Sequence, residues 1–117
     1  MSKLTISASS EKLPELMNFI ENEFRTKPFA AAILDTMKDA TKELVNAVIN
    51  AGGIYSCIHT DVSITKEGCC IQLLYPGPIF NPCSKDKTLC PFTSKEMDEI
   101  SFEFKYGHSV VAIYKKI

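Results

Sequence analysis

Residues Lys42 to Gly53 of this chain have the sequence KELVNAVINAGG, which places two asparagines one helical turn apart at the end of an amphipathic helix. Asparagine has a middling helix propensity, and its side-chain amide competes for backbone hydrogen bonds. A solvated helix face would more readily carry Glu, Lys or Gln at these positions. Asn46 and Asn50 therefore mark either an ordinary wet surface or the wall of a binding site, and the residues alone leave both interpretations open.

The helix that carries these asparagines is predicted from residue 33 to residue 51. Its apolar side chains recur at three- and four-residue steps, the spacing of a buried stripe. The members of the stripe are Ile33, Met37, Ala40, Leu44, Val48 and Ala51. The polar residues fall within roughly a third of the circumference at about 100° per residue, and they are Asp35, Asp39, Lys42, Glu43, Asn46 and Asn50. Gly52 is suited to end the helix in a left-handed conformation.

Length and composition predict one domain over residues 1–117, because 117 residues with 45% hydrophobic content can bury a core without disulfides or metals. The net charge of -1, with basic residues spread along the chain, argues against a nucleic-acid partner. No apolar run approaches the roughly 20 residues of a membrane span, and no signal peptide is recognisable. Five cysteines without a secretory context favour reduced thiols and a cytoplasmic location.

The other elements follow from shorter patterns. An apolar face predicts a helix over residues 10–24, and alternation predicts strands at residues 4–8, 54–66, 69–75, 100–106 and 110–114. Residues 76–93, rich in Pro, Cys, Lys and Asp, are the only long irregular segment that we expect. This order predicts the α+β class, as a two-layer α/β sandwich in which two helices cover one face of a mostly antiparallel mixed sheet.

This element order, together with Asn46-Ala47 near the end of the second helix, resembles the GHKL (histidine-kinase-like) ATPase fold, and specifically its small anti-sigma-factor branch of serine kinases. The similarity extends over nearly the whole chain and includes residues 4–6, 12–20 and 97–102. The resemblance implies that Asn46 helps to hold magnesium on the nucleotide phosphates, with Asn50 beside it in the nucleotide-binding set. An amide oxygen is a suitable hard ligand for that ion.

The adenine-binding segment departs from the family's pattern. The family has an Asp-x-Gly turn whose carboxylate accepts from the adenine amino group, whereas residues 75–82 here read YPGPIFNP. Gly77 and Phe80 fit the pattern, and Asn81 completes the expected nucleotide-binding segment, but Tyr75 stands in place of the aspartate. A tyrosine hydroxyl cannot supply the same charge-assisted contact.

The catalytic base and the lid also depart from the family. The position of the family's glutamate base holds Lys42, and Glu43, rotated by roughly 100°, is the nearest carboxylate and hence the expected catalytic residue of an active enzyme. No glycine occurs between Pro82 and Met97, so the family's glycine-rich phosphate lid has no counterpart. We therefore expect binding of ATP and magnesium to be weakened or lost.

The cysteines offer a second candidate site. Cys69, Cys70, Cys83 and Cys90 are enough thiolates for zinc or an iron-sulfur cluster, although no Cys-x-x-Cys pair occurs and adjacent cysteines in a strand face opposite sides. A redox pair of Cys83 and Cys90 is the alternative.

The remaining thiol and the histidines carry weaker signals. Cys57 and one of the adjacent pair Cys69 and Cys70 are expected to be small buried hydrophobes. The histidines, His59 and His108, have no evident sequence partner for nucleophilic catalysis and are expected at the surface.

Three functions from different classes remain open. The favoured one is an anti-sigma-like regulatory domain that binds a protein partner, either a sigma factor or an anti-anti-sigma-like regulator, with homodimerisation also open. The second is an active ATP-dependent serine kinase that phosphorylates such a partner and uses Glu43 and Asn46. The third is a thiol or metal sensor built on the loop from Cys83 to Cys90.

Overall fold

The helical and alternating patterns of the sequence form two layers, a sheet and a set of helices. The computed structural model describes residues 2–51, 55–84 and 89–117. Within these ranges the chain contains β1 (Ser2–Ser7), η1 (Ser10–Lys12), α1 (Leu13–Arg25), η2 (Pro28–Ile33), α2 (Leu34–Ile49), β2 (Cys57–Ile64), β3 (Gly68–Pro76), α3 (Pro91–Glu96), β4 (Glu99–Lys105) and β5 (His108–Lys116). Gly52 and Ile54, the predicted helix stop and the predicted start of the second strand, lie outside the described residues.

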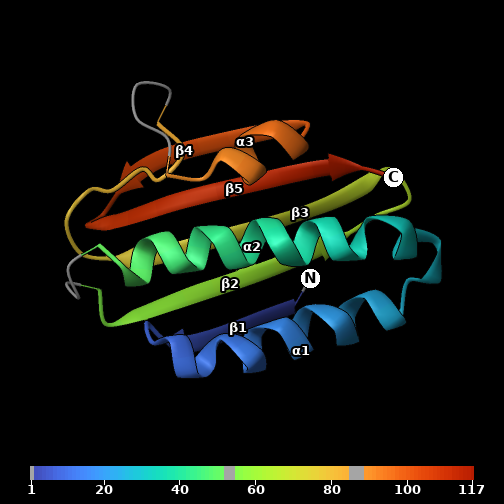
Figure 1. The fold of residues 1–117 in the computed structure, drawn as a ribbon, viewed down its shortest axis with the longest axis horizontal. Coiled ribbons are helices and arrows are strands. Elements are labelled where there is room, and N and C mark those ends of the chain that lie inside the picture. Colours follow the sequence, from blue (N-terminus) through green and yellow to red (C-terminus); the bar gives the residue numbers. More distant parts are fainter. Residues whose placement is uncertain (1, 52–54, 85–88) are drawn as a thin grey trace.

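The sheet has the strand order β1-β2-β3-β5-β4, and each neighbouring pair of strands is antiparallel. Figure 1 shows the helices on one face of this sheet, with α1 along β1, α2 across the middle and α3 beside β4 and β5. The other face has no helix over it in the described part of the chain. The predicted fold class, an α+β two-layer sandwich with two helices on one face of a mostly antiparallel sheet, is confirmed, although the sheet is not mixed, because all of its described strand pairs are antiparallel.

The core lies between the helices and the inner face of the sheet. Four members of the predicted stripe, Met37, Ala40, Leu44 and Val48, are buried in α2, and Thr41 and Val45 beside the stripe are buried with them, whereas Ala51 is only half-buried. Facing them, β2 and β3 bury Ile58, Val62, Ile71 and Leu73. Burial of one such side chain contributes about 1.5–3 kcal/mol. This packing fixes the rotation of α2, so that its polar face points away from the sheet.

Two glycines make the hairpins possible. Gly68 begins β3 so close to β5 that a Cβ atom would lie 2.4 Å from the Lys115 carbonyl oxygen. Gly107, with φ 76°, follows Tyr106, with φ 53°, in the turn between β4 and β5. Glycine adopts this left-handed backbone without the cost that other residues meet. Both hairpins lie where the sequence predicts them.

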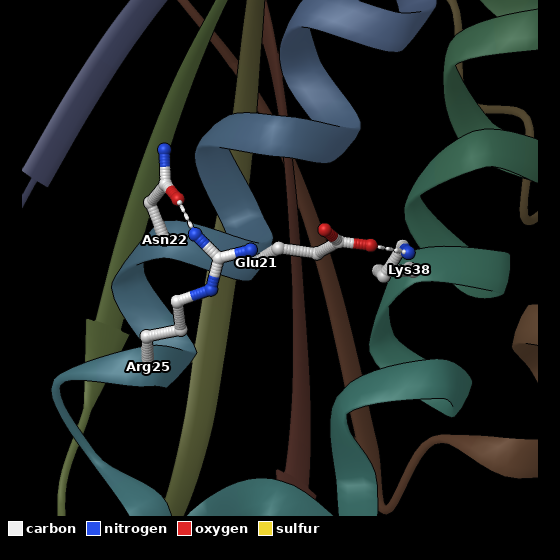
Figure 2. A network of polar contacts seen from close by, with 4 residues as sticks. All are labelled: Glu21, Asn22, Arg25 and Lys38. Carbon is white, nitrogen blue, oxygen red and sulfur yellow. Dashed lines mark hydrogen bonds and ion pairs between the residues drawn. The ribbon is translucent and has the colours of Figure 1, made fainter.

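A polar contact joins the two long helices. Glu21 extends from α1 and accepts a hydrogen bond from Lys38 Nζ on α2, while Arg25 donates to Asn22 within α1 at 2.9 Å (Figure 2). The hydrogen bond and the charge of Lys38 hold the pKa of Glu21 below its ordinary value. The contact therefore favours one alignment of α1 against α2.

Several boundaries differ from the prediction, among them the end of the second helix, which is expected at residue 51 whereas α2 ends at Ile49. The helix expected from residue 33 begins as α2 at Leu34, because residues 28–33 form the 3-10 turn η2. The expected irregular segment over residues 76–93 is also interrupted, since α3 begins at Pro91. None of the helices in the described ranges combines the length and apolar character needed to cross a membrane.

Candidate functional site

A hollow of about 420 Å³ lies beside the C-terminal half of α2. Its lining residues come from α2, from the two residues after it and from the chain that follows β3, and they are Glu43, Asn46, Ala47, Asn50, Ala51, Phe80 and Leu89. Asn46 is half-buried in this wall, whereas Asn50 is exposed. The structure therefore brings together four of the predicted site residues, namely Glu43, Asn46, Asn50 and Phe80.

Glu43 ties α2 to α3. One carboxylate oxygen accepts from the backbone N–H of Thr93 at 2.8 Å, and the other accepts from that of Phe92 at 3.2 Å. These amides belong to the first turn of α3, where backbone donors lack partners within the helix and a negative charge is favourable. Thr93 Oγ1 adds a hydrogen bond to the Ala40 carbonyl at 3.2 Å. The catalytic role of Glu43 stays a prediction, and both of its oxygens are engaged by α3.

Tyr75, which the resemblance places at the position of an adenine-binding aspartate, lies in the core. It is fully buried, and its hydroxyl donates to the Phe80 carbonyl at 2.6 Å. Burial raises its pKa well above the ordinary value. The Tyr55 ring meets the Tyr75 ring edge to face at 5.2 Å between centroids, and the Tyr55 hydroxyl donates to the Pro78 carbonyl at 2.7 Å. The two tyrosines hold the segment 78–80 against the sheet, and Tyr75 does not line the hollow.

Gly77 and Asn81, the other predicted nucleotide-binding residues, also lie outside the lining of this hollow. Gly77 has φ 141° and donates its backbone N–H to the Gly107 carbonyl at 3.0 Å, so it joins the ends of two hairpins. Asn81 Oδ1 accepts from the backbone N–H of Cys83 at 3.0 Å and faces a second hollow. The predicted adenine segment is therefore divided, with only Phe80 at the first hollow.

Cys83 and Cys90 form a thiol pair. Their side chains are hydrogen-bonded to each other, and the backbone N–H of Leu89 donates to the Pro82 carbonyl at 2.8 Å. The hydrogen bond from Cys90 lowers the pKa of Cys83, whereas the same contact and burial raise the pKa of Cys90. Cys83 borders the second hollow, of about 400 Å³, and Cys90 is fully buried. The structure therefore places the Cys83 and Cys90 thiols close together, as the predicted redox pair requires.

The adjacent cysteines lie apart from this pair. Cys69 is fully buried on the inner face of the sheet, and burial raises its pKa to about 12. Cys70 faces the other side, where burial followed by the charges of Asp61 and Glu99 raises its pKa. Among residues 2–51, 55–84 and 89–117, no three His, Cys, Asp or Glu side chains are grouped to hold a metal ion.

The interpretation of His59 and Cys57 needs correction. Cys57 is half-buried on the outer face of the sheet, so it is not a core hydrophobe. Its Sγ lies 3.6 Å from His59 Nε2, and His59 Nδ1 lies 2.7 Å from Thr5 Oγ1. The signal available in the sequence was the spacing of two residues in a strand, which places Cys57 and His59 on one face. The contact of Thr5 with His59 results from the pairing of β1 with β2, and the spacing within β2 does not predict that pairing.

Comparison with known proteins adds no family assignment: neither a scan against protein-family models nor a search of curated proteins found a match to this chain.

Proposed function

We propose that this chain is an anti-sigma-like regulatory domain that acts by binding a protein partner through the hollow beside Asn46, on a histidine-kinase-like scaffold whose nucleotide site is degenerate. The observation that carries the proposal is the chemistry of the hollow. Ala47, Ala51, Phe80 and Leu89 give it apolar walls. The two asparagine amides stand at its side, and Glu43, the one carboxylate among its described lining residues, is engaged by α3.

The residues present do not fit an ATP–magnesium group. The Tyr75 hydroxyl already donates to the Phe80 carbonyl, so it is paired within the chain and does not face the hollow as an adenine-binding group would. A triphosphate is normally held by cations or by converging backbone amides. The described residues that line the hollow include no Lys or Arg. Asn46 alone would be a weak anchor for magnesium, because that ion prefers several oxygen ligands in octahedral geometry.

The same surface suits an apolar side chain of a partner. Leu89 is 51% exposed and the neighbouring segment carries Ile79, which is 64% exposed. Exposed apolar residues around a concave site are typical of protein-binding surfaces, in which a few anchors supply most of the affinity. The amides of Asn46 and Asn50 can bond to backbone groups of the bound segment. We expect the partner to be a sigma factor or an anti-anti-sigma-like regulator.

A cytoplasmic location belongs to this proposal. The five cysteines are in the reduced thiol form in the structure, and reducing compartments keep thiols in that state.

Binding measurements with matched variants test the proposal. Sigma factors and anti-anti-sigma-like proteins of the same genome are titrated one at a time by calorimetry. We expect one of them to bind, and Leu89→Asp to weaken that binding at least about fivefold, since loss of an anchor costs more than about 1 kcal/mol. Phe29→Asp is the control, because Phe29 is 44% exposed but lies in η2, outside the lining of the hollow. Equal weakening by both variants, or no binding to any of these proteins, would count against the proposal.

A second candidate function is a thiol sensor that uses Cys83 and Cys90. The observation in its favour is their mutual hydrogen bond, with Cys83 next to a hollow and Cys90 behind it. A hydroperoxide would oxidise the Cys83 thiolate to a sulfenic acid with release of an alcohol, and the Cys90 thiol would then displace water to form a disulfide. Treatment of the reduced protein should lower the number of titratable thiols from five to three. Retention of all five under these conditions would reject the sensor.

A further inference from the structure

A nucleophile, a base and a third polar group meet on the face of the sheet opposite the helices. The thiol of Cys57 is 3.6 Å from Nε2 of His59, within the range of a hydrogen bond to sulfur. The other ring nitrogen, Nδ1, is 2.7 Å from the hydroxyl oxygen of Thr5. A nucleophile within reach of a base, with the base oriented by another group, is the arrangement that activates side chains for covalent chemistry.

Thr5 is a positioning residue in this set. The register of the sheet places it directly opposite His59, on the edge strand β1. When Thr5 Oγ1 accepts the proton of Nδ1, the lone pair of Nε2 faces the thiol of Cys57. The hydroxyl thereby selects the tautomer in which His59 can receive the thiol proton.

A hollow of about 390 Å³ adjoins His59 on this face, and its polar lining includes Lys3, Asp61 and Gln72. These three side chains lie in one row across the strands, because Lys3 pairs with Asp61 and Asp61 pairs with Gln72. Asp61 Oδ1 is buried and has no hydrogen-bond partner among the described residues. A buried carboxylate oxygen without a donor is costly. The row therefore offers a ligand three kinds of group. The Lys3 ammonium can bind a carboxylate, the Asp61 carboxylate can accept from an ammonium or amide group, and Gln72 supplies a side-chain amide.

We propose that Cys57 is a reactive thiol that forms a mixed disulfide with a small zwitterionic thiol of the amino-acid or peptide type. The co-reactant is the symmetrical disulfide of that thiol. Cys57 passes its proton to His59 Nε2, its sulfur attacks one sulfur of the disulfide, and the S–S bond breaks. The leaving thiolate takes the proton from His59. One S–S bond forms and one breaks, so the products are the mixed disulfide and one free thiol.

This site is separate from the proposed protein-binding hollow, and it does not depend on that function. Cys70 provides an internal control, because it is also half-buried on the outer face of the sheet. Its surroundings disfavour the thiolate, since burial and the charges of Asp61 and Glu99 raise the pKa of Cys70.

The test measures modification of each cysteine in the full-length reduced protein. The protein is exposed to glutathione disulfide, quenched with acid at timed intervals, digested and analysed by mass spectrometry. We expect Cys57 to react about a hundredfold faster than Cys70, the lower end of the effect of a positioned base. His59→Ala should bring the rate at Cys57 close to that at Cys70, and added imidazole should restore part of it. Similar rates at Cys57 and Cys70 in the unmodified protein, or no effect of His59→Ala, would overturn the proposal.

Two further variants separate positioning and recognition from a general effect on folding. Thr5→Ser keeps the hydroxyl and should retain the rate at Cys57, whereas Thr5→Val removes it and should slow the reaction. Asp61→Asn should slow the reaction with glutathione disulfide but not that with uncharged hydroxyethyl disulfide. Equal rates for Thr5→Ser and Thr5→Val would refute the positioning role, and equal effects of Asp61→Asn on both reagents would refute recognition of a zwitterion.

Discussion

Replacement of Glu43 by alanine should destabilise the protein, because it removes the acceptor of two backbone hydrogen bonds from α3. Hydrogen bonds to a charged group contribute about 1.5–3 kcal/mol each in shielded places. Glu43 is only half-buried, so we assign about 1 kcal/mol to each bond, in line with the cost of losing a helix cap. The expected loss in the free energy of unfolding is then about 2 kcal/mol, which corresponds to a fall in Tm of about 8 °C for a domain of this size.

Guanidinium denaturation followed by circular dichroism measures this loss, with the midpoint compared at constant m value. Glu43→Gln keeps one acceptor oxygen and should lose about half as much stability, about 1 kcal/mol. Lys42→Ala is the matched control, because Lys42 is the exposed neighbour on the same helix. If Glu43→Ala stayed within about 0.5 kcal/mol of this control, the capping role would be refuted. A gain in stability would instead be typical of a removed catalytic carboxylate.

Three other perturbations test the packing. Tyr75→Phe should lower the free energy of unfolding by about 1 kcal/mol in urea denaturation, since a backbone carbonyl loses its donor while the ring still fills the core; an unchanged midpoint would exclude that hydrogen bond. Gly68→Ala should cost about 2 kcal/mol or more, because the new Cβ would meet a backbone oxygen at 2.4 Å, and full stability would contradict the register of β3 with β5. Lys38 holds the pKa of Glu21 in the folded state below its ordinary value of 4.5. The contact therefore stabilises the folded state fully above pH 4.5, and this stabilisation is lost as the pH falls through the lower pKa of the folded state. Lys38→Met should therefore flatten the fall in Tm between roughly pH 5 and pH 3, and an unchanged slope would exclude the ion pair.

The elements with a strong period could be predicted from the sequence. The apolar stripe of α2 has its members at helical spacing, and Met37, Leu44 and Val48 are buried as expected. The hairpins can also be predicted from the sequence, because Gly68 and Gly107 interrupt alternating segments where the backbone needs glycine. Local chemistry decides these elements, so neighbouring residues in the sequence suffice to identify them.

The parts that depend on distant contacts could not be predicted. The short helix α3 is capped by Glu43, about 50 residues before it in the chain, so no local cap marks its start. The resemblance marks Tyr75 as a departure from a pattern, but its burial and its bond to Phe80 depend on the packing of the following turn. The contact of His59 with Thr5 likewise requires the register of two strands. For α3 and His59 the decisive partner comes from another element, and for Tyr75 it comes from the irregular segment that follows β3.

A nucleotide-binding measurement tests most directly whether the hollow beside Asn46 binds ATP. The thermal melting of the protein is measured with magnesium and either ATP or ADP, and Asn46→Ala is treated in the same way. A ligand at about a hundred times its Kd adds about 2.7 kcal/mol to the free energy of unfolding, which corresponds to about 10 °C at this chain length. We predict no shift in Tm with either nucleotide for either protein. A shift of that size, present in the unmodified protein and lost in Asn46→Ala, would contradict the proposal of a protein-binding hollow.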